Sequence, residues 1–472
     1  MKKQTISVSR SSLIWGVIGT VLNIAMGILV LPIILVTMSE EDIAIWYVFA
    51  AIQSLIALLD FGFSPTFTRN VTYAFSGAKD IVQSSFTATE QKGEPNLKLL
   101  YAIYRLGRKI YMILSMFVIV ILSTVGLLYF RSVLPSQADY YYISFAIFSL
   151  AMLINIFFSY IPAYMKGIGA VKESYQAYVI SRVLYIAVAC IMLFLNLSLI
   201  AMTSALLLSG LALRIASVVL LKKHNKKLEI ILEKSDEYDQ RKLFSALWFN
   251  TKREGIILLA NFLIQQSATF ISTSYLGLAV SAQYGLTIQL LNIISTLSFV
   301  YFSVVSPRIT QARVDGEQEI TKKYFCNSES FLLLVFIVGC FLMICFGDWA
   351  LNLIGSNSQL LSVPLLIAFS IVFFLEKNHT VCASFISTSN QLPYTMPYFI
   401  SSIIIFALYW ILILFTNCGV WSFVVAQGIV QLCYNNWKWP HYVRKELNLR
   451  IPQIYIQGTK GLWQEMFLPK NR

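Results

Sequence analysis

The chain has 472 residues, of which 57% are hydrophobic and only 12% are charged, yet its net charge is +13. Soluble domains contain roughly 45 to 50% apolar and about 25% charged residues, so this composition excludes a soluble enzyme, a secreted domain and a disordered chain. Because a membrane-spanning helix takes about 20 apolar residues, the apolar content is sufficient for at most about 13 spans. We therefore expect an all-α polytopic membrane protein of ten to twelve spans.

The first apolar run, from Leu13 to Val36, follows a short basic leader containing Lys2, Lys3 and Arg10. A secretory signal peptide has a similar leader, but its apolar stretch is only about 7 to 15 residues long. The run is longer than that, so we expect it to be retained as the first membrane helix.

Apolar windows along the rest of the chain complete a set of twelve expected spans. In chain order the windows are 12–36, 43–64, 110–130, 140–165, 175–197, 199–221, 255–276, 281–305, 328–347, 361–389, 396–416 and 419–437.

Basic residues concentrate in one set of alternate loops between these windows. They are Lys79, Lys92, Lys98, Arg105, Arg108, Lys109, Lys166, Lys172, Lys222, Lys223, Lys226, Lys227, Arg308, Arg313, Lys322 and Lys323. The other set contains Arg131 together with Glu40, Glu41, Asp42, Asp139 and Asp348. Because basic loops stay in the cytoplasm, we expect both termini to be cytoplasmic and the number of spans to be even.

The segment 222–253 divides the windows into six and six, and it contains an amphipathic stretch from Leu228 to Glu233. We interpret it as a cytoplasmic linker between two lobes. The expected organisation is therefore an N-lobe with spans 1 to 6 (1–221), the linker (222–253), a C-lobe with spans 7 to 12 (254–437) and a cytoplasmic tail (438–472).

A trace of duplication supports two lobes. The second span ends in Ser64-Pro65 with Arg69 beyond it, and the eighth ends in Ser306-Pro307 with Arg313 beyond it. Prolines at the same end of corresponding helices fit a parallel six-plus-six repeat about an axis along the membrane normal.

Charged residues inside the windows are few: Asp60, Arg182, Arg214, Glu376 and Lys377. A charge at the centre of a membrane helix costs roughly 2.5 to 3.5 kcal/mol on insertion scales, so each needs a partner or a water-filled cavity. Both interpretations stay open for these five: ion pairs that only support packing, or groups that face a central lumen.

Three further arginines, Arg69, Arg253 and Arg308, lie near the inner ends of windows. Long basic side chains in such positions are able to reach the membrane interface, so a purely interfacial role is open for them as well.

Polar residues form stripes on two of the C-lobe helices. Asn261, Gln265, Thr269 and Ser272 recur with helical spacing in the seventh span, and Gln289, Asn292 and Thr296 recur in the eighth. Such stripes either join helices through hydrogen bonds or line a hydrated cavity. Long amide side chains crowd a tight helix contact, which favours the cavity.

The sequence contains no sign of a metal or nucleotide cofactor. Its three histidines are far apart, no phosphate-binding G-x-x-x-x-G-K-[ST] loop occurs, and the seven cysteines lie in or beside apolar runs without external pairing. We expect any transport to be driven by another source, with Na⁺ or H⁺ as candidate coupling ions.

Two short motifs resemble a known family. They are Leu58-Leu59-Asp60-Phe61-Gly62-Phe63 through Thr68-Arg69 at the end of the second span, and Ile161-Pro162-Ala163-Tyr164-Met165-Lys166-Gly167-Ile168-Gly169 between the fourth and fifth. With the twelve windows and the basic middle loop, they resemble the Wzx-type polysaccharide flippases. These belong to the multidrug/oligosaccharidyl-lipid/polysaccharide (MOP) exporter superfamily, which also contains MurJ and the MATE exporters.

This resemblance implies a V-shaped transporter of two six-helix lobes that carries an undecaprenyl-pyrophosphate-linked sugar unit across the bacterial cytoplasmic (inner) membrane. Its product would be used for O-antigen, capsule or exopolysaccharide. The implied partners are the lipid-linked oligosaccharide, membrane lipids, and a polysaccharide polymerase with other assembly proteins, but no nucleic acid. Relatives closer to MurJ have several arginines in the first span, whereas this chain has only Arg10 at its start, which argues against a lipid II flippase.

The interior residues then receive hypothetical roles. Arginine binds a diphosphate in a bidentate manner, and amide side chains suit sugar hydroxyls. The expected substrate-binding cations are Arg182, Arg214, Lys377, Arg69 and Arg308; the coupling or charge-balancing groups are Asp60 and Glu376; and the polar lining is Asn261, Gln265, Thr269, Gln289 and Asn292.

Two alternative functions remain open. A MATE-like exporter of cationic drugs would need carboxylates in its cavity, and only Asp60 and Glu376 are available. A polysaccharide polymerase or ligase would have a large external loop with Arg and His, and all the expected external loops are short. We therefore expect a transporter rather than an enzyme.

Overall fold

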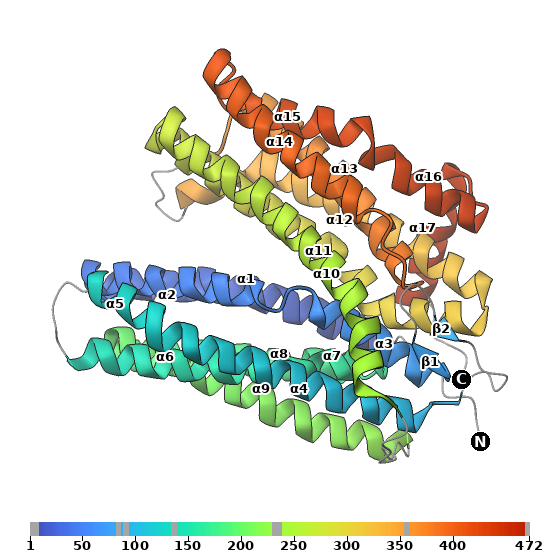
Figure 1. Ribbon diagram of the computed structural model, residues 1–472. Helices are drawn as coiled ribbons and strands as arrows, with labels where there is room; N and C mark the ends of the chain where they lie inside the picture. The colour runs from blue at the N-terminus through green and yellow to red at the C-terminus, as the bar shows by residue number, and fades with distance from the viewer. Residues whose placement is uncertain are drawn as a thin grey trace. The chain divides into compact units, whose positions relative to one another are not determined.

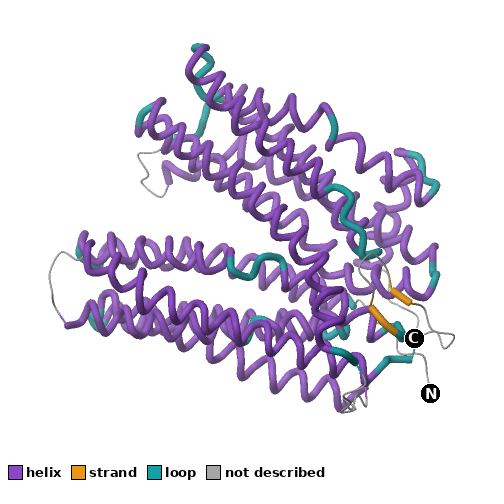
Figure 2. Tube along the Cα trace, viewed as in Figure 1, coloured by secondary structure: helices purple, strands orange, loops and turns teal. Residues whose placement is uncertain are grey.

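The computed structural model describes residues 9–81, 86–87, 94–133, 139–228, 238–353 and 359–467. Nearly all of these residues are helical (Figures 1 and 2). The strands in the described part are β1 (Asp80–Ile81) and β2 (Phe86–Thr87), which pair antiparallel with Asp80 opposite Thr87. The predicted all-α fold class is confirmed.

The chain folds into two compact units, Met1–Thr251 and Lys252–Arg472. Each unit has its own apolar core. The helices of the first unit are α1 (Arg10–Thr37), α2 (Glu40–Leu58), α3 (Phe63–Phe75), α4 (Leu97–Ile121), the π-helical turn η1 (Leu122–Gly126), α5 (Leu127–Val133), α6 (Asp139–Phe157), α7 (Tyr160–Gly167), α8 (Val171–Phe194) and α9 (Ser198–Leu228).

The helix α10 (Gln240–Ile271) begins in the first unit and continues into the second. It is followed by the π-helical turn η2 (Ser272–Leu276), α11 (Leu278–Asp315), α12 (Gln318–Leu353), α13 (Val363–Ser387), α14 (Thr395–Phe415), α15 (Trp421–Cys433), α16 (Asn435–Leu447) and α17 (Ile451–Phe467).

Each of the twelve predicted windows falls on one of these helices or on two or three consecutive ones. Among the described residues, nine helical stretches are by themselves long and apolar enough to cross a membrane. The window 419–437 falls on a broken pair, because the backbone turns at Tyr434 and limits α15 to 13 residues.

The predicted linker 222–253 has to be corrected. Its first residues continue α9 as far as Leu228, and α10 begins at Gln240, while the amphipathic stretch after Leu228 lies outside the described residues. The first turns of α10 are helical because Leu243, Ala246 and Leu247 share one face and are buried in the core of the first unit.

The predicted tail 438–472 is, as far as Phe467, a folded part of the second unit that contains the end of α16 and all of α17, and the residues after Phe467 lie outside the described part of the chain. A Cβ atom on Gly458 of α17 would lie 2.1 Å from the carbonyl oxygen of Cys326, so the backbones of α17 and α12 are in close contact. Glu465 of α17 accepts a hydrogen bond of 2.7 Å from the Tyr301 hydroxyl and lies 3.5 Å from the Lys323 ammonium. Burial raises the pKa of the α17 residue Tyr455 to about 12.

The second span is interrupted at the Asp60-Phe61-Gly62-Phe63 motif. Phe61 and Gly62 adopt left-handed backbone conformations, with φ of +43° and +82°. One carboxylate oxygen of Asp60 accepts a hydrogen bond from the Ser64 N–H at the start of α3, and the other accepts one from the Tyr111 hydroxyl. The motif therefore ends α2, starts a new helix and joins both to α4.

The two motifs that carried the family resemblance pack directly against each other. The Thr68 hydroxyl of α3 donates to the Ala163 carbonyl of α7 at 3.2 Å, and the Thr72 hydroxyl donates to the Gly167 carbonyl at 3.0 Å. A Cβ atom on Gly167 would lie 2.5 Å from a methyl carbon of Val71. Close approach of the two helices therefore requires glycine at this position.

The Ser-Pro pairs that suggested a repeat have different local structures. Pro65 lies in the first turn of α3, after the break at Gly62, where a missing N–H costs nothing. Pro307 lies inside α11, which continues to Asp315. The two Ser-Pro pairs therefore occupy different positions within their helices, although their sequences are alike.

Replacing Gly167 by Ala should destabilise the first unit. The added methyl group would meet both Val71 and the Thr68 carbonyl oxygen, at 2.5 and 2.8 Å. We expect a loss of about 1 to 3 kcal/mol in unfolding free energy, measured by denaturant titration in detergent. The control is Gly285→Ala, because nothing lies within 4 Å of the added carbon there. Equal stability of the two variants would contradict the close contact of α3 with α7.

The expected orientation is testable through Cys418, an exposed residue between α14 and α15. In a variant in which Cys418 is the single cysteine, we expect a membrane-impermeant maleimide to label right-side-out vesicles and not inverted ones. Introducing the single cysteine as Lys223→Cys, at an exposed position in the basic last turns of α9, should give the opposite result. Labelling of both sites from the same side would refute the odd number of spans, five, that the predicted windows place between them.

Candidate functional site

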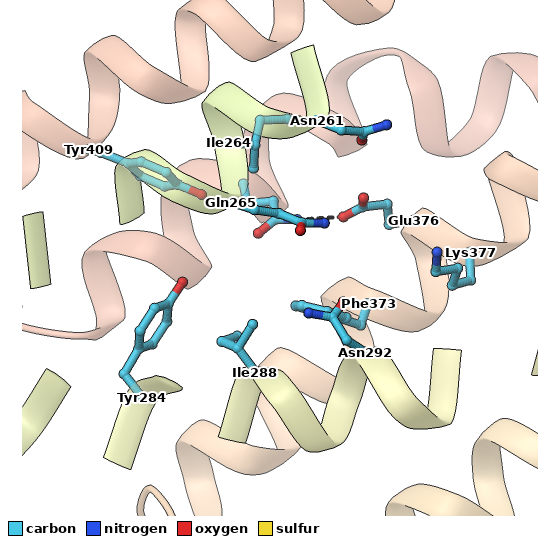
Figure 3. A pocket seen from close by; sticks show the side chains of 11 residues that line it. Asn261, Ile264, Gln265, Tyr284, Ile288, Asn292, Phe373, Glu376, Lys377 and Tyr409 are labelled. Carbon is cyan, nitrogen blue, oxygen red and sulfur yellow. Dashed lines mark hydrogen bonds between the residues drawn. The ribbon is translucent and has the colours of Figure 1, made fainter. Parts of the chain in front are cut away.

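A small polar pocket lies inside the second unit, between five helices (Figure 3). Its lining residues are Asn261, Ile264 and Gln265 of α10, Tyr284, Ile288 and Asn292 of α11, Phe373, Glu376 and Lys377 of α13, Tyr409 of α14 and Gln427 of α15. The pocket therefore brings together five of the predicted site residues: Asn261, Gln265, Asn292, Glu376 and Lys377.

Helical periodicity explains why these side chains meet. Asn261 and Gln265 are four residues apart on α10, and Ile288 and Asn292 are four apart on α11, so each pair shares one helix face. The helix α13 presents Phe373, three residues before Glu376, to the same space.

Two hydrogen bonds hold the polar groups of the pocket. The Gln427 amide donates to a carboxylate oxygen of Glu376, and the Tyr398 hydroxyl donates to the Asn261 side-chain oxygen at 2.6 Å. Lys377 acts electrostatically on Glu376. Figure 3 shows Glu376 and Lys377 on one side of the pocket and the rings of Tyr284 and Tyr409 on the other.

The size of the pocket limits what it holds as it stands. Its volume is about 30 Å³, and a cavity needs about 10 to 15 Å³ to admit one water. One or two waters or a small ion therefore fit, but a sugar does not. Glu376 is the single carboxylate in the lining, and no group of three or more His, Cys, Asp or Glu side chains in the described part of the chain is arranged to bind a metal.

Two predicted lining residues lie outside the pocket. Ile288 of α11 lines the pocket, and the next residue, Gln289, points about 100° away from it. The Gln289 side chain is exposed. Thr269 is also exposed, and its hydroxyl donates to the Gln265 carbonyl oxygen at 3.2 Å. The predicted stripe on α10 therefore contributes only its first two members.

Arg182 and Arg214 lie in the first unit, both half-buried and on neighbouring helices. The Arg182 guanidinium lies 3.6 Å from the sulfur of Met26 on α1. The Arg214 guanidinium lies over the Phe158 ring, 4.2 Å from its centre. Within the described ranges neither arginine has a carboxylate partner.

The other predicted charges have structural contacts. Arg308 forms an ion pair with Glu317 at 2.6 Å, so we remove it from the set of substrate-binding candidates. Arg69 is buried in α3 beside Thr66, at 3.4 Å. Both oxygens of Asp60 are used by Ser64 and Tyr111, as described above, so Asp60 does not balance Arg182 or Arg214.

Sequence reasoning missed several residues. Tyr284, Tyr409 and Gln427 line the pocket, and of these Gln427 could have been noticed as a long amide within an apolar window. It also missed Glu329, a fully buried carboxylate of α12. Glu329 is the second residue of the window 328–347, where a charge is usually interfacial.

Comparison with solved structures identifies the architecture. The chain aligns with the outward-facing conformation of a multidrug resistance MATE family transporter of the MOP superfamily with a TM-score of 0.72. The identity is 12%, and the match covers 93% of this chain and 94% of the other. The chain has the MATE transporter fold.

Other MATE-fold structures give similar matches. A MATE structure in a bent conformation has a TM-score of 0.71 and 13% identity, over 93% of this chain and 94% of the other. A MOP superfamily transporter from Pyrococcus furiosus has a TM-score of 0.68 and 12% identity, over 93% and 96%. No family model and no curated protein sequence matches the chain.

The hydrogen bond between Tyr398 and Asn261 is expected to stabilise the second unit. Tyr398→Phe removes the donor and leaves the Asn261 oxygen without it, which should lower the unfolding free energy by about 1 kcal/mol. Tyr284→Phe is the matched control, since no hydrogen bond of the Tyr284 hydroxyl is found among the described residues. Denaturant titration of both variants in detergent measures the difference; if both lose the same amount, this hydrogen bond does not stabilise the unit.

Proposed function

We propose that the protein is a flippase that moves undecaprenyl-pyrophosphate-linked oligosaccharide from the inner to the outer leaflet of the cytoplasmic membrane by alternating access. The observation that carries the proposal is the pair of interior arginines, Arg182 and Arg214, which have no carboxylate partner among the described residues. Their charge is available to a negatively charged cargo.

Arg182 has only a weak neighbour for its charge. A thioether sulfur is a poor hydrogen-bond acceptor, so Met26 does little to balance a guanidinium that is largely removed from water. An interior charge of this kind is costly, roughly 2.5 to 3.5 kcal/mol at a helix centre. A pyrophosphate would supply the missing negative charge through bidentate hydrogen bonds.

Arg214 is held in a way that leaves its hydrogen-bond donors available. The guanidinium carbon lies over the Phe158 ring, 4.2 Å from its centre, and this cation–π contact uses none of the hydrogen-bond donors. Nη1 has no hydrogen-bond partner among the described residues. The charge is thus held by an aromatic ring, while at least this donor is left for an anion.

The polar lining of the pocket in the second unit is suited to bind a polar cargo or a coupling ion. Amide and hydroxyl groups from Asn261, Gln265, Asn292 and Tyr284 suit sugar hydroxyls once the space widens. Glu376 is our candidate for Na⁺ or H⁺ coupling, because it is the one carboxylate in the lining.

A MATE-like, cation-coupled exporter of small molecules is the second candidate. The fold and the presence of Glu376 in the pocket favour it. The MOP superfamily transporter from Pyrococcus furiosus is described as having a binding pocket of reverse polarity that suggests a different function. This fold therefore does not fix the charge of the cargo. Lys377 beside Glu376 makes the pocket less suited to a cation, so we favour the flippase.

Removing either interior arginine charge should abolish surface glycan. In a host whose surface polysaccharide depends on this protein, we expect Arg182→Gln and Arg214→Gln each to reduce surface glycan at least about tenfold. Each substitution removes a charge-assisted contact of about 1.5 to 3 kcal/mol. Immunoblotting of surface glycan, with protein levels measured in parallel, tests this. The control is Arg131→Gln, an exposed arginine of α5.

Two results separate the candidate functions. Wild-type glycan in both variants, at normal protein levels, would refute the proposed role of these arginines. Efflux of a cationic dye that depends on Glu376 and is unaffected by Arg182→Gln and Arg214→Gln would instead support the exporter.

A further inference from the structure

Glu329 is a carboxylate enclosed inside the second unit. It lies on α12, only 2% of its surface is exposed, and it does not line the pocket around Glu376. Its position therefore requires an explanation other than the site described above.

The contacts of Glu329 are made by neutral groups. The Asn378 side-chain amide donates to one carboxylate oxygen at 2.7 Å, and the Cys382 thiol donates to the other at 3.5 Å. Both partners belong to α13. Cys326 on α12 itself and Tyr455 from α17 are the other titratable groups that act on it electrostatically.

No cation balances Glu329 in the described part of the chain. On α11, the third helix packed against α12, the Tyr301 hydroxyl bonds to Asn327 and Glu465 instead. Other carboxylates at this end of the unit do have cations: Glu465 lies 3.5 Å from Lys323, and Glu317 lies 2.6 Å from Arg308.

A carboxylate in such surroundings is stable only in its neutral form. An ionised carboxylate removed from water needs a paired cation, and an amide with a weak thiol donor is not an equivalent. A protonated Glu329 keeps both contacts, because its carbonyl oxygen accepts from Asn378 while its hydroxyl is able to donate to the Cys382 sulfur.

We propose that Glu329 is a proton-binding site, separate from the pocket around Glu376, and that its proton holds α12 against α13. Asn378 and Cys382 are four residues apart and so share the α13 face that contacts Glu329. Glu376 precedes Asn378 by two residues and points about 200° away, into the pocket. Loss of the proton therefore disrupts a contact on one side of α13 whose other side forms the pocket.

Infrared difference spectroscopy of the purified full-length protein tests the site without any knowledge of the cargo. On raising the pH, we expect the wild type to lose a carbonyl stretching band of a protonated carboxyl group, with the band shifting in ²H₂O. The band should be missing from Glu329→Gln and retained in Glu376→Gln and in Glu465→Gln, the matched change at a carboxylate with a cation. If the band that Glu376→Gln retains is also present in Glu329→Gln, the proposal is overturned.

The thiol of Cys382 gives a second readout that leaves Glu329 intact. The S–H stretching band reports on its hydrogen bond, and Cys382→Ala identifies the band. We expect its frequency to shift over the same pH range in which the carboxyl band is lost. An S–H band that does not change with pH would overturn the proposed contact even if Glu329→Gln failed to fold.

Hydrogen exchange tests the link to α13. After correction for the intrinsic effect of pH, we expect the amides of residues 376–382 to exchange faster in the deprotonated wild type than in the protonated wild type. In Glu329→Gln this pH dependence should be lost. Equal pH dependence of exchange in the variant and the wild type would refute a role for Glu329 in holding α13, independently of whether the protein is a flippase.

Discussion

Inside an apolar surrounding, each polar side chain has to find its partner within the chain, and this constraint organises the second unit around α13. Within about one turn, Glu376 accepts from Gln427 of α15, Asn378 donates to Glu329 of α12, and His379 lies 2.8 Å from Asn436 of α16. Three neighbouring helices are thus fixed to α13 by hydrogen bonds whose loss would leave buried groups unsatisfied. Of these α13 residues, Glu376 also lines the pocket.

Within its described helices the first unit meets the constraint differently, because the carboxylates Asp42 and Asp60 are not paired with the interior arginines Arg182 and Arg214. Asp42 accepts hydrogen bonds from the hydroxyls of Tyr140 and Ser198, and Asp60 accepts one from Tyr111. These carboxylates are satisfied by hydroxyl groups, while Arg182 and Arg214 are held by a sulfur and an aromatic ring. A fold that only had to neutralise its charges would pair them. The separation leaves positive charge for a ligand, which is the physical basis of the flippase proposal.

Hydropathy predicted the spanning helices because apolar length alone determines them, but it did not predict where they break. The turn at Phe61 and Gly62 depends on left-handed backbone angles. The helix that follows this turn packs against Gly167, and this contact joins residues that are 95 positions apart in the sequence. In the pocket, helical periodicity grouped Asn261 with Gln265, and both residues line it. Gln289 does not line the pocket, because periodicity shows which residues share a helix face but not which part of that face a neighbouring helix covers. Glu329 was missed because it is the second residue of its window, where a charge is usually interfacial. The sequence also placed α17 in a tail, although this helix packs on α12 at Cys326, three residues before Glu329.

The charges of α13 connect the two proposals. Glu376 and Lys377 together give the pocket no net charge, so as it stands it favours neither a cation nor an anion. If Glu376 takes up a proton, Lys377 remains as an uncompensated positive charge beside amides and hydroxyls. Protonation of Glu376 therefore changes the net charge of the pocket. Glu329 contacts the opposite face of α13 through Asn378 and Cys382, so a proton on Glu329 controls how α13 packs on α12, while a proton on Glu376 controls the charge of the pocket on the other side of the same helix.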